Sequence, residues 1–215
     1  MSATTSPVIL AIDTSAGTSI ALVCEGTVLA AASTPDTMRH AEVVGSMIAQ
    51  CFAEAGLAAS TVTHVAAGMG PGPFTGLRVG IAAAEAFALG VDAQLLPMVS
   101  HDGIAREALA AHPGSAVLVV TDARRKELYW SEYSGLDENG CPTRVAGPAL
   151  AKPDELPATH AARIDSTEVP AGALGLIADA MLAAGTQFSE AEALYLRSPD
   201  VTLSNGPKRV VQWMK

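Results

Sequence analysis

The sequence predicts an α/β fold made of two related lobes. Short apolar segments typical of buried strands alternate with longer segments in which apolar residues recur at helical spacing. A turn rich in glycine and proline separates an apolar segment ending at Met69 from a helical pattern that begins at Leu77. An apolar strand that ends in aspartate occurs twice, once at Asp13 and again at Asp122. This internal repetition indicates that the second lobe is related to the first.

The first half of the chain supplies a complete lobe. The expected strands cover residues 8–13, 19–24, 27–32, 63–69 and 94–99, and the expected helices cover residues 38–55, 77–88 and 100–111. Gly56 ends the first helix, and Ser100 is expected to cap the third. Three strands followed by helix, strand, helix, strand and helix is the order of a ribonuclease H-like domain, the half-unit of actin-like folds.

The second half begins in the same way but is expected to be eroded. Strands are expected at residues 117–122 and 127–133, residues 142–157 are expected to be rich in loops, and one clear helix covers residues 171–184. The prediction is therefore an actin-like (ASKHA) fold, with one lobe at residues 1–112 and a smaller one at 113–215. The segment 198–215 fits either a short helix or a frayed tail, and it is a candidate for completing the first lobe.

The composition narrows the function classes. The net charge is −9, which argues against nucleic-acid binding by this chain alone. Charged residues make up 16% of the chain, below the roughly 25% of a typical soluble domain. This shortage fits either an alanine-rich core or a surface that a partner covers. The three cysteines, without a CxxC pair, and the lack of a signal-peptide pattern or a long apolar span predict a cytoplasmic chain with no membrane segment.

The sequence offers no convincing catalytic or metal-binding motif. No two histidines lie three to five residues apart, HExxH is missing, and no Gly-Lys-Ser/Thr follows the glycine-rich turn. Ser100, His101 and Asp102 are adjacent at a helix start and would point in different directions, so a helix cap is favoured over a catalytic triad. No catalytic residue, metal ligand or resident cofactor is expected.

Candidates for nucleotide binding are Asp13, Gly70 and Gly72, because a glycine-rich turn before a helix can hold an anion. The competing interpretation, which we favour, is that Asp13 and Asp122 stabilise turns through local hydrogen bonds. The basic run Arg124 to Lys126 could contact an RNA phosphate or an acidic neighbour, although most such runs at a turn are simply solvated.

The first two helices carry more apolar surface than one buried face requires. The second helix has small or apolar residues on the side away from the sheet, and the first has apolar residues beside its expected core stripe. The residues predicted to form a partner surface are His40, Val43, Met47, Arg78, Ala82, Glu85, Ala86 and Leu89. His40 fits a packing role at the start of the first helix equally well.

Five segments resemble one family, the bacterial TsaB proteins, also called YeaZ. They are Ile9–Ser15, Arg39–Glu42, Gly70–Gly80, Asp122–Trp130 and Tyr195–Arg197. The segment Gly70–Gly80 is highly specific. The chain departs from the family pattern at three places: Ala193 replaces a proline, Ala86 replaces a common glycine, and Gly45-Ser46 stands where a proline is usual.

The resemblance implies a non-catalytic scaffold and activator subunit of the machinery that makes threonylcarbamoyladenosine, at the adenosine next to the anticodon of tRNA. It further implies pairing with the catalytic subunit TsaD through the first two helices, and association with the small ATPase TsaE. Alone, the chain is expected to form a homodimer through the same surface, and tRNA would be reached only through the complex. A nucleotide at the shared subunit interface stays open. The competing hypotheses are a stand-alone actin-like ATP hydrolase, a metallopeptidase homologue, or a tRNA-binding module.

Overall fold

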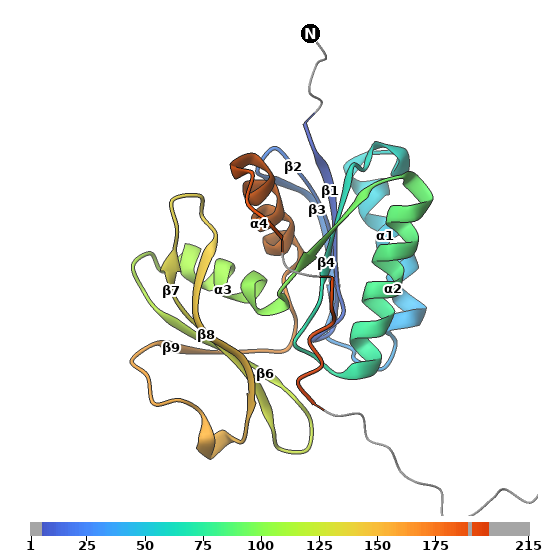
Figure 1. Cartoon of the computed structure of the whole chain (residues 1–215). Helices are drawn as coiled ribbons and strands as arrows, with labels where there is room; N and C mark the ends of the chain where they lie inside the picture. Colours follow the sequence, from blue (N-terminus) through green and yellow to red (C-terminus); the bar gives the residue numbers. More distant parts are fainter. Residues whose placement is uncertain (1–5, 189–190, 198–215) are drawn as a thin grey trace, which may run out of the picture.

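The computed structural model describes residues 6–188 and 191–197, which form two sheets with helices packed between and beside them (Figure 1). The first sheet has the strand order β3-β2-β1-β4-β5, in which β1 pairs antiparallel with β2 and parallel with β4. Its strands are β1 (Val8–Asp13), β2 (Thr18–Cys24), β3 (Thr27–Thr34), β4 (His64–Gly68) and β5 (Gln94–Met98). The order of these strands and of the helices between them along the chain is the predicted one.

Helices cover both faces of this sheet. On one face lie α1 (His40–Ala55) and α2 (Phe74–Val91), and α4 (Ala171–Ala184) covers the other (Figure 1). A fourth helix, α3 (Ser100–Ala111), packs on α4 and on strands of the second sheet. Because α4 comes from the second half of the chain yet packs on the first sheet, the two halves interlock. The division at residues 112 and 113 stays a prediction, and the tail 198–215 lies outside the described residues.

The second sheet repeats the first four strands of the first. Its order is β8-β7-β6-β9, with β6 antiparallel to β7 and parallel to β9. The strands are β6 (Val117–Asp122), β7 (Leu128–Leu136), β8 (Pro142–Ala151) and β9 (Ala162–Ser166). A short 3-10 helix, η2 (Pro153–Glu155), joins β8 to β9 at the position where the first lobe has α1. Within the described residues, the second sheet therefore lacks a crossover α-helix between β8 and β9 and has four strands instead of five.

The prediction of a loop-rich segment at 142–157 is wrong for its first ten residues, and β9 was not predicted at all. Both strands lie at an edge of the sheet, where one side of the backbone needs no partner strand. An edge strand tolerates Pro148 and a bulged Gly147, residues that normally argue against a strand. The prediction that Ser100 caps α3 is also wrong. Val99 occupies the cap position without a side-chain bond, and Ser100 is the first helical residue.

Among the described residues, α2 is the one helix that is long and apolar enough to cross a membrane by length and composition. One side of it packs on β4, β1 and β5, and the core helices of soluble proteins pass the same test. The buried residues of α2 are Gly76, Leu77, Gly80, Ala84 and Ala88. The opposite side of this apolar helix is exposed.

Candidate partner surface and the site between the lobes

The glycine-rich segment brings α2 against the turn that follows β1. A Cβ atom on Gly76 would lie 2.6 Å from the carbonyl oxygen of Thr14, and one on Gly80 would lie 2.2 Å from Thr14 Oγ1. Real Cβ atoms do not approach other atoms so closely, so both positions require glycine in this arrangement. The Thr14 hydroxyl donates a hydrogen bond to the carbonyl oxygen of Gly76 at 2.6 Å. These glycines therefore serve close packing between a helix and a strand end.

Asp13 and Asp122 both act as turn residues, as the favoured interpretation predicted. The backbone N–H of Ser15 donates to Asp13 Oδ1 at 2.8 Å, and that of Arg124 donates to Asp122 Oδ1 at 2.9 Å. Asp13 is buried and Asp122 is exposed. Burial raises the pKa of Asp13, while hydrogen bonds from the Ser100 and Ser15 side chains act in the opposite direction. The same local bond thus recurs at equivalent strand ends in the two lobes.

Gly70 and Gly72 do not form an open cradle for phosphate. The Gly70 N–H already donates to Ser100 Oγ at 3.0 Å. A Cβ on Gly72 would lie 2.7 Å from that of Ser15, so the chain itself fills this space. The carbonyl oxygen of Gly72 accepts a hydrogen bond from the Tyr129 hydroxyl at 3.3 Å. The Gly70 amide and the space beside Gly72 are therefore already occupied within this chain, and a nucleotide bound between this chain and a partner stays a prediction.

The side chains of Ser100, His101 and Asp102 point to different partners. The two ring nitrogens of His101 lie 2.9 Å from the hydroxyls of Ser131 and Thr121, on β7 and β6. Burial, together with the nearby Arg144, lowers the pKa of His101 to about 3, so the ring is neutral. The imidazole joins α3 to the second sheet and has no ring nitrogen left to activate a nucleophile.

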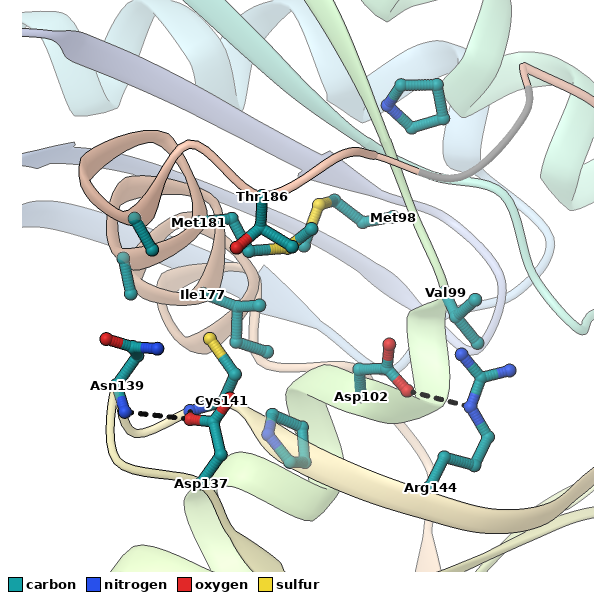
Figure 2. Close-up of a pocket in the computed structure, with 14 residues that line it drawn as sticks. Met98, Val99, Asp102, Asp137, Asn139, Cys141, Arg144, Ile177, Met181 and Thr186 are labelled. Atoms are coloured by element: carbon teal, nitrogen blue, oxygen red, sulfur yellow. Dashed lines mark hydrogen bonds and ion pairs between the residues drawn. The ribbon is translucent and has the colours of Figure 1, made fainter.

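Asp102 belongs to a pocket of about 210 Å³ between α4, the end of β5 and the β7–β8 hairpin (Figure 2). Its carboxylate accepts a hydrogen bond from the Tyr133 hydroxyl at 2.7 Å and lies 3.4 Å from Arg144 Nε. Cys141 also lines the pocket, and burial raises the pKa of its thiol, which keeps it protonated and poorly nucleophilic. Within the described residues, no cluster of three or more His, Cys, Asp or Glu side chains could hold a metal ion.

The residues of α2 that were predicted for the partner surface are exposed in the structure, whereas two of those on α1 are buried. Arg78, Ala82, Glu85, Ala86 and Leu89 are exposed, and Leu89 is 85% exposed.

On α1, Val43 is half-buried, but the prediction of Met47 as a partner-surface residue is wrong, because it is only 8% exposed. His40 is 7% exposed, which favours the packing role over the partner contact. His40 Nδ1 lies 2.8 Å from the Thr18 hydroxyl, which supports the packing role. Met47 belongs to the core between α1 and the sheet, with Val44 and Cys51. The core stripe of α1 is thus rotated from the predicted one.

Sequence reasoning missed a contact between the C-terminal segment 191–197 and both lobes. The Leu194 N–H donates to the carbonyl oxygen of Met69 at 2.8 Å. The ring of Tyr195 lies 4.8 Å from that of Phe74, which in turn lies 3.7 Å below the Arg78 guanidinium. Arg197 donates to the carbonyl oxygen of Ala123 at 3.1 Å. The motif Tyr195–Arg197 was visible in the sequence, but nothing in its spacing indicates these distant partners.

The turn between β6 and β7 has an unusual backbone. Arg124, Arg125 and Lys126 have φ angles of 64°, 51° and 63°, so three consecutive residues other than glycine adopt the left-handed conformation. Each such residue costs roughly 1–2 kcal/mol relative to the right-handed region. The basic turn, as we call residues 124–126, is thus a strained and exposed element beside the start of α1.

The topology that is repeated in the two sheets defines a class of protein, the actin-like α/β proteins of two ribonuclease H-like lobes. The family model for TsaD, tRNA N6-adenosine threonylcarbamoyltransferase, matches residues 31–196. A solved structure from Pseudomonas aeruginosa, described as that of an uncharacterized protein similar to the peptidase YeaZ, superimposes with a TM-score of 0.77 at 27% identity. It covers 89% of this chain and 100% of the compared chain. The predicted fold is confirmed.

Curated relatives support the same family. The tRNA threonylcarbamoyladenosine biosynthesis protein TsaB of Escherichia coli is 34% identical over 147 residues, which are 68% of this chain and 63% of that protein. An uncharacterized protein of Mycobacterium leprae is 34% identical over 196 residues, which are 83% of this chain and 51% of that protein. The chain thus spans about half to two-thirds of the length of these curated relatives. It belongs to the TsaB family, also called YeaZ, within the wider family that the transferase model defines.

Proposed function

We propose that this chain is a non-catalytic scaffold and activator subunit of the machinery that adds threonylcarbamoyl to the adenosine next to the anticodon of tRNA. In this proposal it pairs with a TsaD-type transferase through α1 and α2. The observation that carries the proposal is the outer side of α2, where Ala82, Ala86 and Leu89 are exposed on a helix whose only charged residues are Arg78 and Glu85. Such a surface is costly to leave in water and favours a covering partner.

The residues of this surface suit a close contact between helices. Ala82 and Ala86 lie one turn apart and lack bulky side chains, so a partner helix can approach the backbone of α2 closely. Leu89 lies one turn further on and provides an apolar anchor. Arg78 and Glu85 flank the strip and can form polar contacts at its edge. In the absence of the transferase, two copies of this chain would pair through the same strip, and α1 and α2 of each would form a four-helix contact.

The chemistry inside the chain supports an accessory role. The amide of Gly70 is engaged by Ser100, His101 is held neutral between two hydroxyls, and Cys141 is a protonated thiol. The TsaE-type ATPase, a nucleotide at the shared interface, access to tRNA through the complex and a cytoplasmic location complete the proposal. A stand-alone ATP hydrolase or metallopeptidase is the competing function. Stoichiometric zinc or ATP turnover by the isolated chain would support that competitor.

Reconstitution tests the proposal. A TsaD-type transferase, a TsaE-type ATPase, an activated threonylcarbamoyl donor and an unmodified tRNA transcript are combined with and without this chain, and modified adenosine is quantified. The proposal predicts modification only when this chain is present, and none when this chain replaces the transferase. Equal modification without it would contradict the activator role, and modification by this chain without the transferase would contradict the accessory role.

A further inference from the structure

We propose that the basic turn, residues 124–126, contacts the phosphate backbone of RNA and is the part of this chain that holds tRNA in the assembled complex. This inference rests on the proposed function, because the isolated chain has a net charge of −9 and is poorly suited to attract RNA alone. It assigns a role to an element that the partner surface on α2 does not use.

The strained turn is built from residues that are unusual for its backbone conformation. A tight turn with positive φ angles is normally built from glycine, asparagine or aspartate, because other side chains are disfavoured there. Here Arg124, Arg125 and Lys126 occupy three such positions in succession, and all three are exposed. None of them packs in a core that would compensate for the backbone conformation. We therefore infer that the turn serves to present three adjacent cationic side chains to solvent.

Hydrogen bonds hold the turn from within and from the C-terminal segment. The backbone N–H of Ala123 donates to the carbonyl oxygen of Glu127, and that of Glu127 donates to the carbonyl oxygen of Arg124, each at 3.0 Å. From outside the turn, the Arg197 guanidinium donates to the carbonyl oxygen of Ala123 and lies 3.4 Å from a Glu127 carboxylate oxygen. Cations presented by a fixed backbone lose less freedom when they bind. Arg197 is thus a positioning residue for the turn.

The acidic neighbours of the turn are already engaged. Asp122 accepts the Arg124 N–H and lies 3.7 Å from the Arg124 guanidinium, and Glu127 pairs with Arg197. A second nitrogen of the Arg124 guanidinium donates to the Thr37 hydroxyl at 2.7 Å. This contact places the turn beside the segment that leads into α1. The basic turn therefore lies at the N-terminal end of a helix that belongs to the proposed partner contact, and the proposal requires RNA held by the transferase to reach this end.

An aromatic group beside the turn favours RNA over an acidic protein as the ligand. Tyr195 is 42% exposed and lies two residues from Arg197, which corresponds to at most about 7 Å along the chain. Its ring contacts that of Phe74, with the two ring centroids 4.8 Å apart. Cations that meet phosphates, next to aromatic rings and guanidinium planes on which bases stack, are the combination that proteins use for unpaired RNA. Binding of an acidic peptide would require the cations of the turn but not the aromatic ring beside them.

The test compares two double variants that lose the same charge. One is Arg125→Gln with Lys126→Gln in the basic turn. The other is Lys152→Gln with Arg163→Gln, exposed cations elsewhere in the second lobe that form local ion pairs. Each is assembled with the TsaD-type transferase, and binding of a fluorescent, unmodified tRNA transcript is followed by anisotropy at several salt concentrations. Size-exclusion chromatography confirms that each complex has formed, and the same chromatography with the TsaE-type ATPase monitors protein contacts.

The turn variant is expected to weaken tRNA binding about tenfold and to lower the slope of log affinity against log salt by about 1.5, since each lost phosphate contact removes roughly 0.7–0.9. The matched variant should stay within about twofold of the unchanged complex. Unchanged tRNA affinity in a properly assembled turn variant would overturn the inference. Loss of ATPase binding with unchanged tRNA affinity would also overturn it and would assign the turn to an acidic protein surface. Failure of the unaltered chain to assemble with the transferase would instead refute the proposed function itself.

Discussion

The hydroxyl of Thr14 donates a hydrogen bond to the carbonyl oxygen of Gly76, and this 2.6 Å contact fixes where α2 lies on the first sheet. Thr14 follows β1 and Gly76 lies in the first turn of α2, so the bond joins two elements far apart in sequence. The missing side chain of Gly76 is what allows the approach. The outer side of α2 that we assign to a partner is positioned by this buried contact.

Replacement of Gly76 by alanine is expected to destabilise the fold. The added Cβ would lie 2.6 Å from a backbone oxygen of Thr14, which cannot move away as a flexible side chain can. Overpacking of this kind costs about 1–3 kcal/mol. Denaturant titration of the purified chain measures it. Gly90→Ala is the control within the same helix, because nothing lies within 4 Å of its added Cβ, and it should gain about 0.5–1 kcal/mol. Equal stability of the two variants would refute the packing argument.

The second prediction concerns pH and His101. Because the pKa of His101 falls to about 3 in the folded chain, the ring stays neutral there, while the unfolded chain takes up a proton near pH 6.5. The unfolded state thus binds more protons below pH 6.5, and stability falls as the pH is lowered from 6.5 towards 3. The slope from this group is at most about 1.4 kcal/mol per pH unit. Raised pKa values of Asp13 and Asp102 act in the opposite direction below neutral pH.

Comparison with a variant that lacks His101 isolates the contribution of this residue to the pH dependence of stability. The unfolding free energies of the unaltered chain and of His101→Gln are measured between pH 5 and pH 7.5. The variant lacks the titrating group, so the stability gap between the two proteins should narrow as the pH falls below 6.5. A gap that is constant over this range would show that burial does not hold His101 neutral in the folded chain.

The third prediction separates backbone strain from charge at the basic turn. Lys126→Gly and Lys126→Ala remove the same cation, but only glycine relieves the left-handed backbone at this position. The glycine variant should be more stable than the alanine variant by about 1 kcal/mol. Both should weaken tRNA binding by the assembled complex to the same extent. If glycine were no more stable than alanine in thermal unfolding, the turn would not be strained in solution.

The parts of the fold with strong local signals could be predicted from the sequence. The strand from Val8 to Asp13 is an apolar segment that ends in aspartate, and the helix from Ala171 to Ala184 has Asp179 as its only charged residue and ends at glycine, so the sequence predicts the bounds of both. The edge strands β8 and β9 could not be predicted in the same way, because residues such as Pro148 and Arg163 are compatible with an edge but weaken the alternation that predicts a strand.

Only part of the candidate partner surface could be predicted from local sequence patterns. The exposed strip on α2 follows from helical periodicity, which places Ala82, Ala86 and Leu89 away from the sheet. Met47 was misplaced because the register of α1 against the sheet depends on which side chains fit there, and periodicity alone does not determine that. The contact of Arg197 with Ala123 joins residues that are distant in sequence and depends on the whole fold. Such contacts become visible only once both lobes are assembled.

Pairing of the exposed strip of α2 with a TsaD-type transferase is tested most directly by one titration. Ala82→Glu places a carboxylate in the middle of this strip, where an apolar contact would leave it without a partner. Ala110→Glu places the same group on an exposed position of α3, outside the strip. Calorimetric titration of the transferase should show affinity reduced about 100-fold or more, roughly 3 kcal/mol, for Ala82→Glu, and within about twofold of the unaltered chain for Ala110→Glu. Full affinity of a folded Ala82→Glu chain would contradict the claim.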